Sequence, residues 1–154
     1  MNPMFEKRCE LGEDAYVVRD QLICVTDGVG GWRRKLVYTG LFTKEFVKHI
    51  AALYDAKNYT TLKDLLDNAS KMTKAKGSTT CVMAELRDEN PYQMDTCNLG
   101  DSGYLLVRPT HKNGEPHIEK LFRSATQQHR FNAPYQTGTE KTWPTRAFST
   151  SHSI

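Results

Sequence analysis

The chain has 154 residues and a mass of 17.6 kDa, which suits one folded domain and argues against two independent ones. With 38% hydrophobic and 25% charged residues, it does not have the composition of a disordered protein. Its net charge of +3 is small and scattered, so we expect no nucleic-acid partner. No apolar run reaches the roughly 18 residues of a membrane helix, and residues 1–10 do not resemble a targeting signal.

The first predicted elements are two short strands. Residues 15–19 and 22–26 are β-branched apolar runs separated by Asp20 and Gln21, which is typical of a tight hairpin. The second run leads directly into a glycine-rich turn, residues 27–31. The hairpin therefore places the start of the first strand close to the end of the second.

Two helices are predicted next. Apolar residues recur at steps of three or four over residues 36–56 and again over 61–74, as on one face of a helix. Thr61 and Asp64 resemble a capping box at the start of the second helix, with Asp in place of the usual Glu.

The remaining elements are predicted to be strands, at residues 79–86, 94–99, 104–108 and 118–122. Tight turns are expected between them at residues 100–103 and 113–114. The order of two strands, two helices and four strands favours an α+β fold with mainly antiparallel pairing. After Gly138 the sequence is rich in Ser and Thr and has no apolar period, so we expect residues 139–154 to be a loose tail.

The four cysteines lie far apart and include no Cys-x-x-Cys pair: Cys9, Cys24, Cys81 and Cys97. Because three of them lie within apolar stretches, we interpret them as reduced core residues of an intracellular protein. A zinc site or a disulfide framework is the alternative. The five histidines show no metal-ligand spacing and are interpreted as surface or packing residues.

Asp27 is the first candidate for chemistry. It ends an apolar strand and begins a glycine-rich turn, where a carboxylate is unfavourable without a partner. Mg²⁺ or Mn²⁺ would be a natural partner, and Gly28, without a Cβ, would let its carbonyl reach the same ion. The alternative is an ordinary turn with a solvated aspartate. A dinucleotide phosphate loop fits poorly, because its third glycine would fall at Arg33 and no parallel βαβ unit follows.

Further acidic residues favour the metal interpretation. The predicted hairpin brings Glu13 and Asp14 near Asp27, and converging carboxylates repel one another unless a cation neutralises them. Asp101 lies in the turn 100–103 at the end of another strand, where the alternative role is that of an ordinary turn residue.

Four motifs, taken in order, resemble those of one family. They are Gly12-Glu13-Asp14-Ala15, Val25-Thr26-Asp27-Gly28-Val29-Gly30-Gly31-Trp32, Gly77-Ser78-Thr79-Thr80 and Asn98-Leu99-Gly100-Asp101-Ser102-Gly103. The set resembles the metal-dependent protein serine/threonine phosphatases, the PPM or type 2C class. Gly31-Trp32 and residues 127–136 are similar to the branch that includes mitochondrial and plastid members.

The resemblance implies a β-sandwich of two antiparallel sheets flanked by helix pairs, with a metal site at one end. By analogy, Asp27 would bridge two Mg²⁺ or Mn²⁺ ions, and the Gly28 carbonyl would bind one of them. Glu13 would hold a metal-bound water, and Asp101 would belong to a third metal. The implied reaction is hydrolysis of phosphoserine or phosphothreonine in a phosphoprotein by a metal-activated water, with Asp27 and Glu13 as catalytic residues.

The sequence departs from the family pattern at three places. Val29 stands where the family often has a histidine proposed as general acid, and Cys9 stands where it has a phosphate-binding arginine, a role that we transfer to Arg8. Metal-binding segments expected downstream have no counterpart after Gly138, so we expect residues 1–138 to be the N-terminal part of the domain. An inactive fragment that acts as a binding module is the alternative function. The branch implies the mitochondrion, the cytoplasm is the alternative, and the oligomeric state is left open.

Overall fold

The computed structural model describes residues 12–87, 92–140 and 146–153. Arg8 and Cys9, singled out above, lie outside this part of the chain. The described elements are, in order, β1 (Ala15–Val18), β2 (Leu22–Thr26), the 3₁₀ helix η2 (Gly30–Lys35), α1 (Gly40–Asp55), α2 (Leu62–Met72), β3 (Ser78–Thr79), β4 (Cys81–Arg87), β5 (Gln93–Leu99), β6 (Leu105–Lys112), β7 (Glu115–Arg123), β8 (Gln128–Arg130), β9 (Ala133–Pro134), β10 (Thr137–Gly138) and β11 (Phe148–Ser153).

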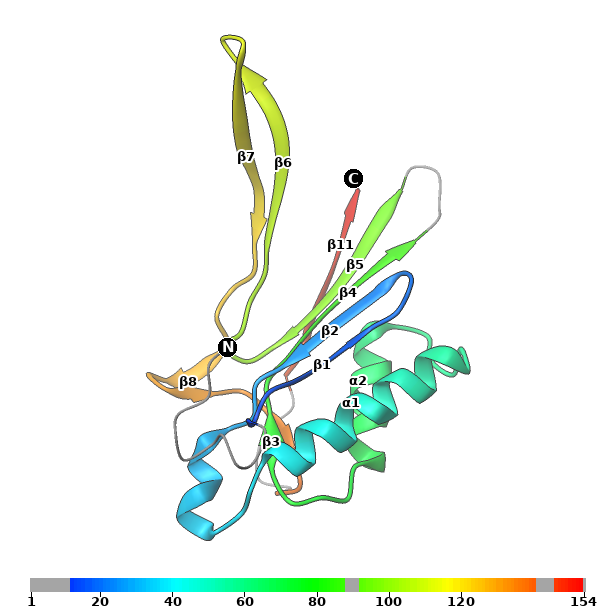
Figure 1. Ribbon diagram of the computed structural model, residues 1–154, viewed down its shortest axis with the longest axis vertical. Coiled ribbons are helices and arrows are strands. Elements are labelled where there is room, and N and C mark those ends of the chain that lie inside the picture. The colour runs from blue at the N-terminus through cyan, green and yellow to red at the C-terminus, as the bar shows by residue number, and fades with distance from the viewer. Residues whose placement is uncertain (1–11, 88–91, 141–145, 154) are drawn as a thin grey trace.

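The main layer is a five-stranded sheet in the order β1-β2-β4-β5-β11, and α1 and α2 cover one of its faces (Figure 1). Every strand pair is antiparallel, which confirms the predicted α+β class. In β2 the side chains of Leu22, Cys24 and Thr26 are buried, whereas those of Ile23 and Val25 are exposed. This alternation follows from the two-residue period of a strand and shows that only one face of the sheet meets the helices.

The hydrophobic core lies between this sheet and the two helices. Helix α1 contributes large buried side chains such as Phe42, Phe46 and Ile50, and α2 contributes Leu65 and Leu66. Cys24, Cys81 and Cys97 are buried there as predicted. The helices therefore hold β2, β4 and β5 from one side, which fixes where the connecting turns emerge.

The cap of α2 matches its prediction. The Thr61 hydroxyl accepts a hydrogen bond from the backbone N–H of Asp64 at 3.1 Å, and Asp64 Oδ2 accepts one from the backbone N–H of Thr60 at 3.1 Å. The aspartate therefore reaches back to the residue before the cap, not to the cap residue itself. Both bonds satisfy N–H groups that would otherwise lack partners at the helix start.

Helix α1 begins later than its apolar pattern predicts. Residues 30–35 form η2, and Leu36 follows it in the left-handed conformation, with φ of 55°. This conformation ends η2, and α1 starts only at Gly40. The apolar side chain of Leu36 is almost wholly exposed, so its agreement with the helical period is coincidental.

The second layer is small, which agrees with the prediction of a partial, truncated β-sandwich. Within the described residues, the strands outside the main sheet form three two-stranded sheets, and β6–β7 is the longest of these. Its turn at Asn113 and Gly114 has positive φ at both residues, as the sequence predicts for a tight hairpin. At its base, Tyr104 and Phe122 pack against His152 of β11.

The prediction of a loose tail is wrong for residues 148–153. They form β11, which pairs along β5 over the whole strand, from Phe148 opposite Asn98 to Ser153 opposite Gln93 (Figure 1). Ser and Thr occupy most of β11 because both of its faces are largely open, so no apolar alternation marks it as a strand. Among the helices of the described residues, none has the length and apolar content needed to cross a bilayer.

Candidate functional site

The β1–β2 hairpin brings the backbone of Glu13 against the glycine-rich turn. Ala15 lies opposite Thr26 at the end of the ladder. Two residues beyond this pair, Glu13 therefore lies beside Gly28. A Cβ on Gly28 would lie 2.5 Å from the Glu13 carbonyl oxygen and 2.9 Å from Thr39 Cγ2. Only glycine at position 28 therefore lets the Glu13 backbone come so close. The sequence predicts this meeting of Glu13 with the turn that carries Asp27.

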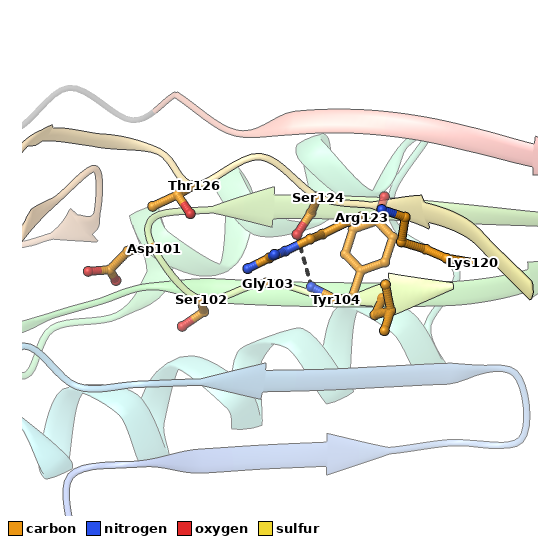
Figure 2. Close-up of a pocket in the computed structure, with 9 residues that line it drawn as sticks. Asp101, Ser102, Gly103, Tyr104, Lys120, Arg123, Ser124 and Thr126 are labelled. Carbon is orange, nitrogen blue, oxygen red and sulfur yellow. Dashed lines mark hydrogen bonds between the residues drawn. The ribbon is translucent and has the colours of Figure 1, made fainter. Parts of the chain in front are cut away.

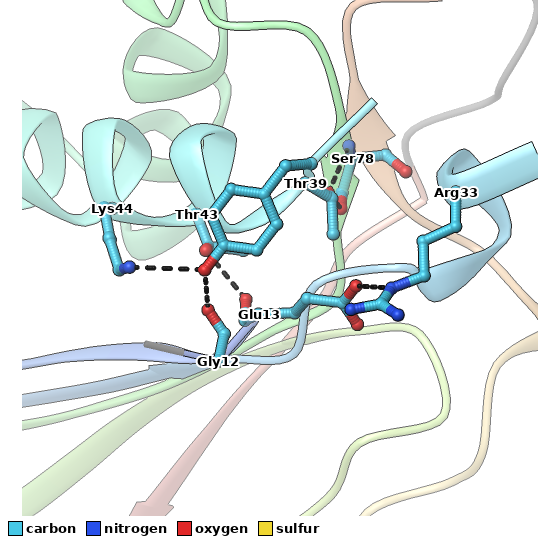
Figure 3. Close-up of polar contacts among 8 residues, drawn as sticks. Gly12, Glu13, Arg33, Thr39, Thr43, Lys44 and Ser78 are labelled. Atoms are coloured by element: carbon cyan, nitrogen blue, oxygen red, sulfur yellow. Dashed lines mark hydrogen bonds and ion pairs between the residues drawn. The ribbon is translucent and has the colours of Figure 1, made fainter. Parts of the chain in front are cut away.

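Glu13 is a buried carboxylate with a cationic partner (Figure 3). Arg33 Nε donates a hydrogen bond to Glu13 Oε1 at 3.0 Å, and a Cβ on Gly30 would lie 3.5 Å from Glu13 Oε2. The Thr43 hydroxyl of α1 donates to the Glu13 carbonyl at 2.8 Å. A buried carboxylate is unfavourable unless it is paired, and Arg33 supplies that pairing.

Arg33 is the functional candidate that the sequence interpretation misses. It appears there only as the residue that occupies the place of a third glycine. Its position in η2, directly after the glycine-rich turn, was the available signal, because a basic residue there can fold back over the same turn. Arg8, the arginine transferred from the family pattern, lies outside the described residues.

The backbone of Asp27 is held by the third motif. Its carbonyl accepts hydrogen bonds from the Thr80 backbone N–H at 3.0 Å and the Thr79 hydroxyl at 2.9 Å. The Val29 N–H donates to the Ser78 carbonyl at 3.0 Å. Asp27 itself is exposed to solvent. The turn is thus fixed through its backbone, which leaves the Asp27 carboxylate on an accessible edge.

Ser78 connects the turn to the segment 127–136. Its hydroxyl accepts from Trp32 Nε1 at 2.6 Å and donates to Gln136 Oε1 at 2.7 Å. Its backbone also exchanges hydrogen bonds with the Thr39 hydroxyl. A hydroxyl that is buried and fully engaged is a structural group, not a nucleophile, as the sequence interpretation holds for this motif.

Asp101 lies in the turn between β5 and β6 and is exposed. The neighbouring Ser102 hydroxyl is hydrogen-bonded to the Thr80 hydroxyl, with 2.7 Å between the oxygens. The Gly100 carbonyl accepts from the Gln127 N–H at 2.8 Å. Thr80 therefore contacts both the Asp27 turn and the Asp101 turn, which links the second, third and fourth motifs.

The donor atoms at the Asp27 turn are of the chemical type that binds a hard divalent cation. A carboxylate on an accessible edge, adjacent peptide carbonyls and a second, buried carboxylate are the oxygen donors that Mg²⁺ and Mn²⁺ prefer. The set is incomplete, however: the described parts of the chain contain no group of three or more His, Cys, Asp or Glu side chains arranged to hold a metal. Glu13, Asp27 and Asp101 thus do not form one ligand cluster here.

No protein-family model matches the chain. It is 37% identical over 139 residues to "Probable protein phosphatase 2C 80" of Arabidopsis thaliana and 35% identical over 136 residues to "Protein phosphatase PTC7 homolog fig" of Drosophila mojavensis. These matches cover 87% and 81% of this chain but only 31% and 41% of the relatives. The chain thus spans less than half the length of these two relatives.

Two solved structures share the fold. The chain superposes on the photosystem II phosphatase PBCP with a TM-score of 0.80 and 29% identity, over 97% of this chain and 57% of that one. The PPM Ser-Thr phosphatase MsPP from Mycobacterium smegmatis gives a TM-score of 0.59 at 16% identity, over 89% of this chain and 65% of that one, which is a likeness of fold alone.

Proposed function

We propose that this chain, which belongs to the PPM, or type 2C, family of protein phosphatases, is part of an enzyme that hydrolyses phosphoserine and phosphothreonine in proteins. The observation that carries the proposal is the meeting of Glu13 with the Asp27–Gly28 turn, in which one carboxylate is buried and ion-paired and the other is solvent-exposed. We further propose Mg²⁺ or Mn²⁺ as its cofactor. Bound there, such ions would make a water molecule more acidic and stabilise charge on the phosphoryl group.

The residues of this chain would act as follows. The Asp27 carboxylate and the Gly28 carbonyl would hold the cation at the exposed edge of the turn, and Asp101 would bind a further cation. Glu13 would orient the attacking water by accepting a hydrogen bond from it, because its carboxylate is fixed from the other side by Arg33. Val29 carries no ionisable group, so the leaving oxygen would take its proton from solvent.

The substrate class implied is a phosphoprotein. The mitochondrial location that the branch resemblance implies stays a prediction, with the cytoplasm as its alternative. The binding-module alternative makes a different prediction about metal, because a protein that only binds a partner does not need a cation at Asp27.

The proposal is tested by comparing the chain with Asp27→Asn and a control, Asp20→Asn, in which the exposed aspartate lies in the turn at the opposite end of the β1–β2 hairpin. We expect Mn²⁺ binding, measured by calorimetry, and Mn²⁺-dependent phosphate release from a phosphopeptide to be lost in Asp27→Asn and kept in Asp20→Asn. Equal activity of Asp27→Asn and the unmodified chain would refute the role of Asp27. Metal binding at Asp27 without phosphate release by any variant would refute catalysis by this chain alone.

A further inference from the structure

A cavity of about 520 Å³ lies beside the Asp101 turn. Its wall is formed by the turn after β5, the first residue of β6, the C-terminal part of β7, and Ser124 and Thr126 (Figure 2). The volume is in the range of pockets that hold small ligands or single side chains of a partner, roughly 300–1,000 Å³. Asp101 lines this cavity, whereas Glu13, Asp27 and Gly28, the other residues given roles above, do not.

Two cationic side chains of β7, Lys120 and Arg123, line the cavity. Residues three apart on a regular strand face opposite sides, but the β6–β7 register shifts between Leu106 and Val107, so that Lys120 lies opposite Val107 and Arg123 opposite Leu105. This irregularity turns both cations to the same cavity. In the part of the chain that the structure describes, neither makes an ion pair, with Asp101 or with any other acid.

Hydroxyl groups complete the lining. The Ser124 Oγ accepts a hydrogen bond from the Tyr104 backbone N–H at 2.9 Å, which leaves its own O–H to donate. A Cβ on Gly103 would lie 2.7 Å from this oxygen, so glycine there makes room for it. In Figure 2 the Arg123 side chain extends from β7 toward the turn that carries Ser102 and Gly103. Arginine, lysine and hydroxyl donors around one space are the groups that bind phosphate or carboxylate.

The cavity is connected to the candidate metal turn through one residue. The Ser102 hydroxyl on its wall is hydrogen-bonded to the Thr80 hydroxyl at 2.7 Å, and the Thr80 N–H donates to the Asp27 carbonyl at 3.0 Å. A peptide with its phosphoserine at the Asp27 turn would therefore have its neighbouring residues within reach of the cavity.

We propose that this cavity is an anion subsite, in which Arg123, Lys120 and Ser124 bind a carboxylate or a second phosphate on the protein substrate, next to the phosphorylated residue that is hydrolysed. The identity of the anion as part of a substrate depends on the proposed phosphatase function. The capacity of the cavity to bind an anion does not, because its groups act without metal. The enzyme would consequently favour acidic or multiply phosphorylated segments.

The first test is calorimetric titration of the metal-free, chelator-treated chain with inorganic phosphate. We expect binding that weakens about five- to tenfold in Arg123→Gln, since a charge-assisted hydrogen bond is lost at a partly exposed site. Lys120→Gln should weaken it less, because an ammonium binds phosphate only as a point charge. Asp101→Asn should strengthen it by removing a like charge. The matched control is Lys112→Gln, an exposed lysine at the far end of β6 outside the cavity.

Absence of phosphate binding, or equal weakening in Arg123→Gln and Lys112→Gln, would overturn the anion subsite whether or not the chain hydrolyses phosphopeptides. Absence of metal-dependent hydrolysis with intact phosphate binding would instead refute catalysis by this chain alone and leave the cavity as an anion site.

The second test distinguishes the two sources of the anion. Fluorescence anisotropy would compare three labelled phosphoserine peptides whose flanking residues are glutamine, glutamate or a second phosphoserine. We expect the glutamine peptide to bind most weakly, and the preference for the acidic peptides to vanish in Arg123→Gln but not in Lys112→Gln. Whichever acidic peptide binds more tightly identifies carboxylate or phosphate as the ligand. Equal binding of all three peptides would contradict the proposal.

Discussion

Arg33 and Glu13 form an ion pair in which the arginine side chain is 37% exposed and the glutamate side chain only 2%. The glutamate comes from the residues before β1 and the arginine from η2, 20 residues later, so the pair closes the glycine-rich turn from both sides. Arg33 is a cation that the structure places against this buried carboxylate. Arg33 therefore neutralises the Glu13 carboxylate in the folded chain, as we propose that a divalent cation neutralises the neighbouring Asp27.

Replacing Arg33 with glutamine should leave the Glu13 carboxylate buried beside a neutral group. We expect a loss of about 1–2 kcal/mol in the free energy of unfolding without metal, less than for a fully buried pair because Arg33 is partly exposed. Added Mn²⁺ should reduce this loss, since it supplies positive charge to the same turn. Urea unfolding with and without Mn²⁺ measures both effects. The control is Arg34→Gln, at the neighbouring exposed arginine. An equal loss of unfolding free energy in Arg34→Gln would contradict the role of the Arg33–Glu13 pair.

Two glycines of the same turn provide a matched test of the close approach. Gly28→Ala places a Cβ 2.5 Å from the Glu13 carbonyl oxygen, whereas a Cβ on Gly31 meets nothing within 4 Å. We expect Gly28→Ala to lower the unfolding free energy by about 1–3 kcal/mol and to weaken Mn²⁺ binding, since the hairpin must shift. Gly31→Ala should change neither. Similar urea midpoints for the two variants would show that the hairpin does not pass Gly28 so closely.

Glu45 on α1 should make stability depend on pH. The backbone N–H groups of Lys74 and Ala75 donate to its carboxylate at 3.0 and 2.8 Å and lower the pKa of Glu45. Because the folded pKa is depressed, this stabilisation is present at neutral pH and is lost as the pH falls through the folded pKa. Glu45→Gln should therefore be less stable than the unmodified chain at pH 7, and the two should converge in acid. Urea unfolding at a series of pH values measures this, and Glu119→Gln, on the exposed β7, is the control, which should be as stable as the unmodified chain at pH 7.

The buried cysteines should react only after unfolding. Burial raises the pKa of Cys97 to about 11. The pKa of Cys81 is raised mainly by its hydrogen bond with the Cys24 thiol and, second, by burial. Little thiolate is then present near neutral pH, and thiolate is the reactive form. In a Cys9→Ser background, a chromogenic disulfide reagent should label these core thiols in urea but not in buffer. Rapid labelling of the folded chain would mean that the core around β2 and β4 opens readily.

The last strand should contribute to stability. Removing residues 148–154 would leave the edge of β5 unpaired and take His152 away from Tyr104 and Phe122. We expect a lower melting temperature and a greater tendency to aggregate, as for other exposed strand edges. His152→Ala in the complete chain separates the aromatic contact from the strand pairing and should cause a smaller change. A truncated chain as stable as the complete one would show that β11 is dispensable.

The sequence alone determined the elements whose signals are local. The β1–β2 hairpin, the Thr61 cap of α2 and the Asn113–Gly114 turn were predictable because strand period, capping chemistry and positive-φ residues act between near neighbours. The order of the four motifs also carried the resemblance to the PPM phosphatases, and with it the acidic residues of the proposed site.

Only the tertiary structure decided the contacts that depend on distant segments. β11 is a strand because β5 offers it a partner, not because its own residues favour one. Likewise, Arg33 matters because the hairpin carries the buried Glu13 to it, and Lys120 faces the cavity with Arg123 because β6 and β7 pair irregularly. Burial, ion pairing and shared cavities arise from chain segments that meet only on folding, so no local pattern encodes them.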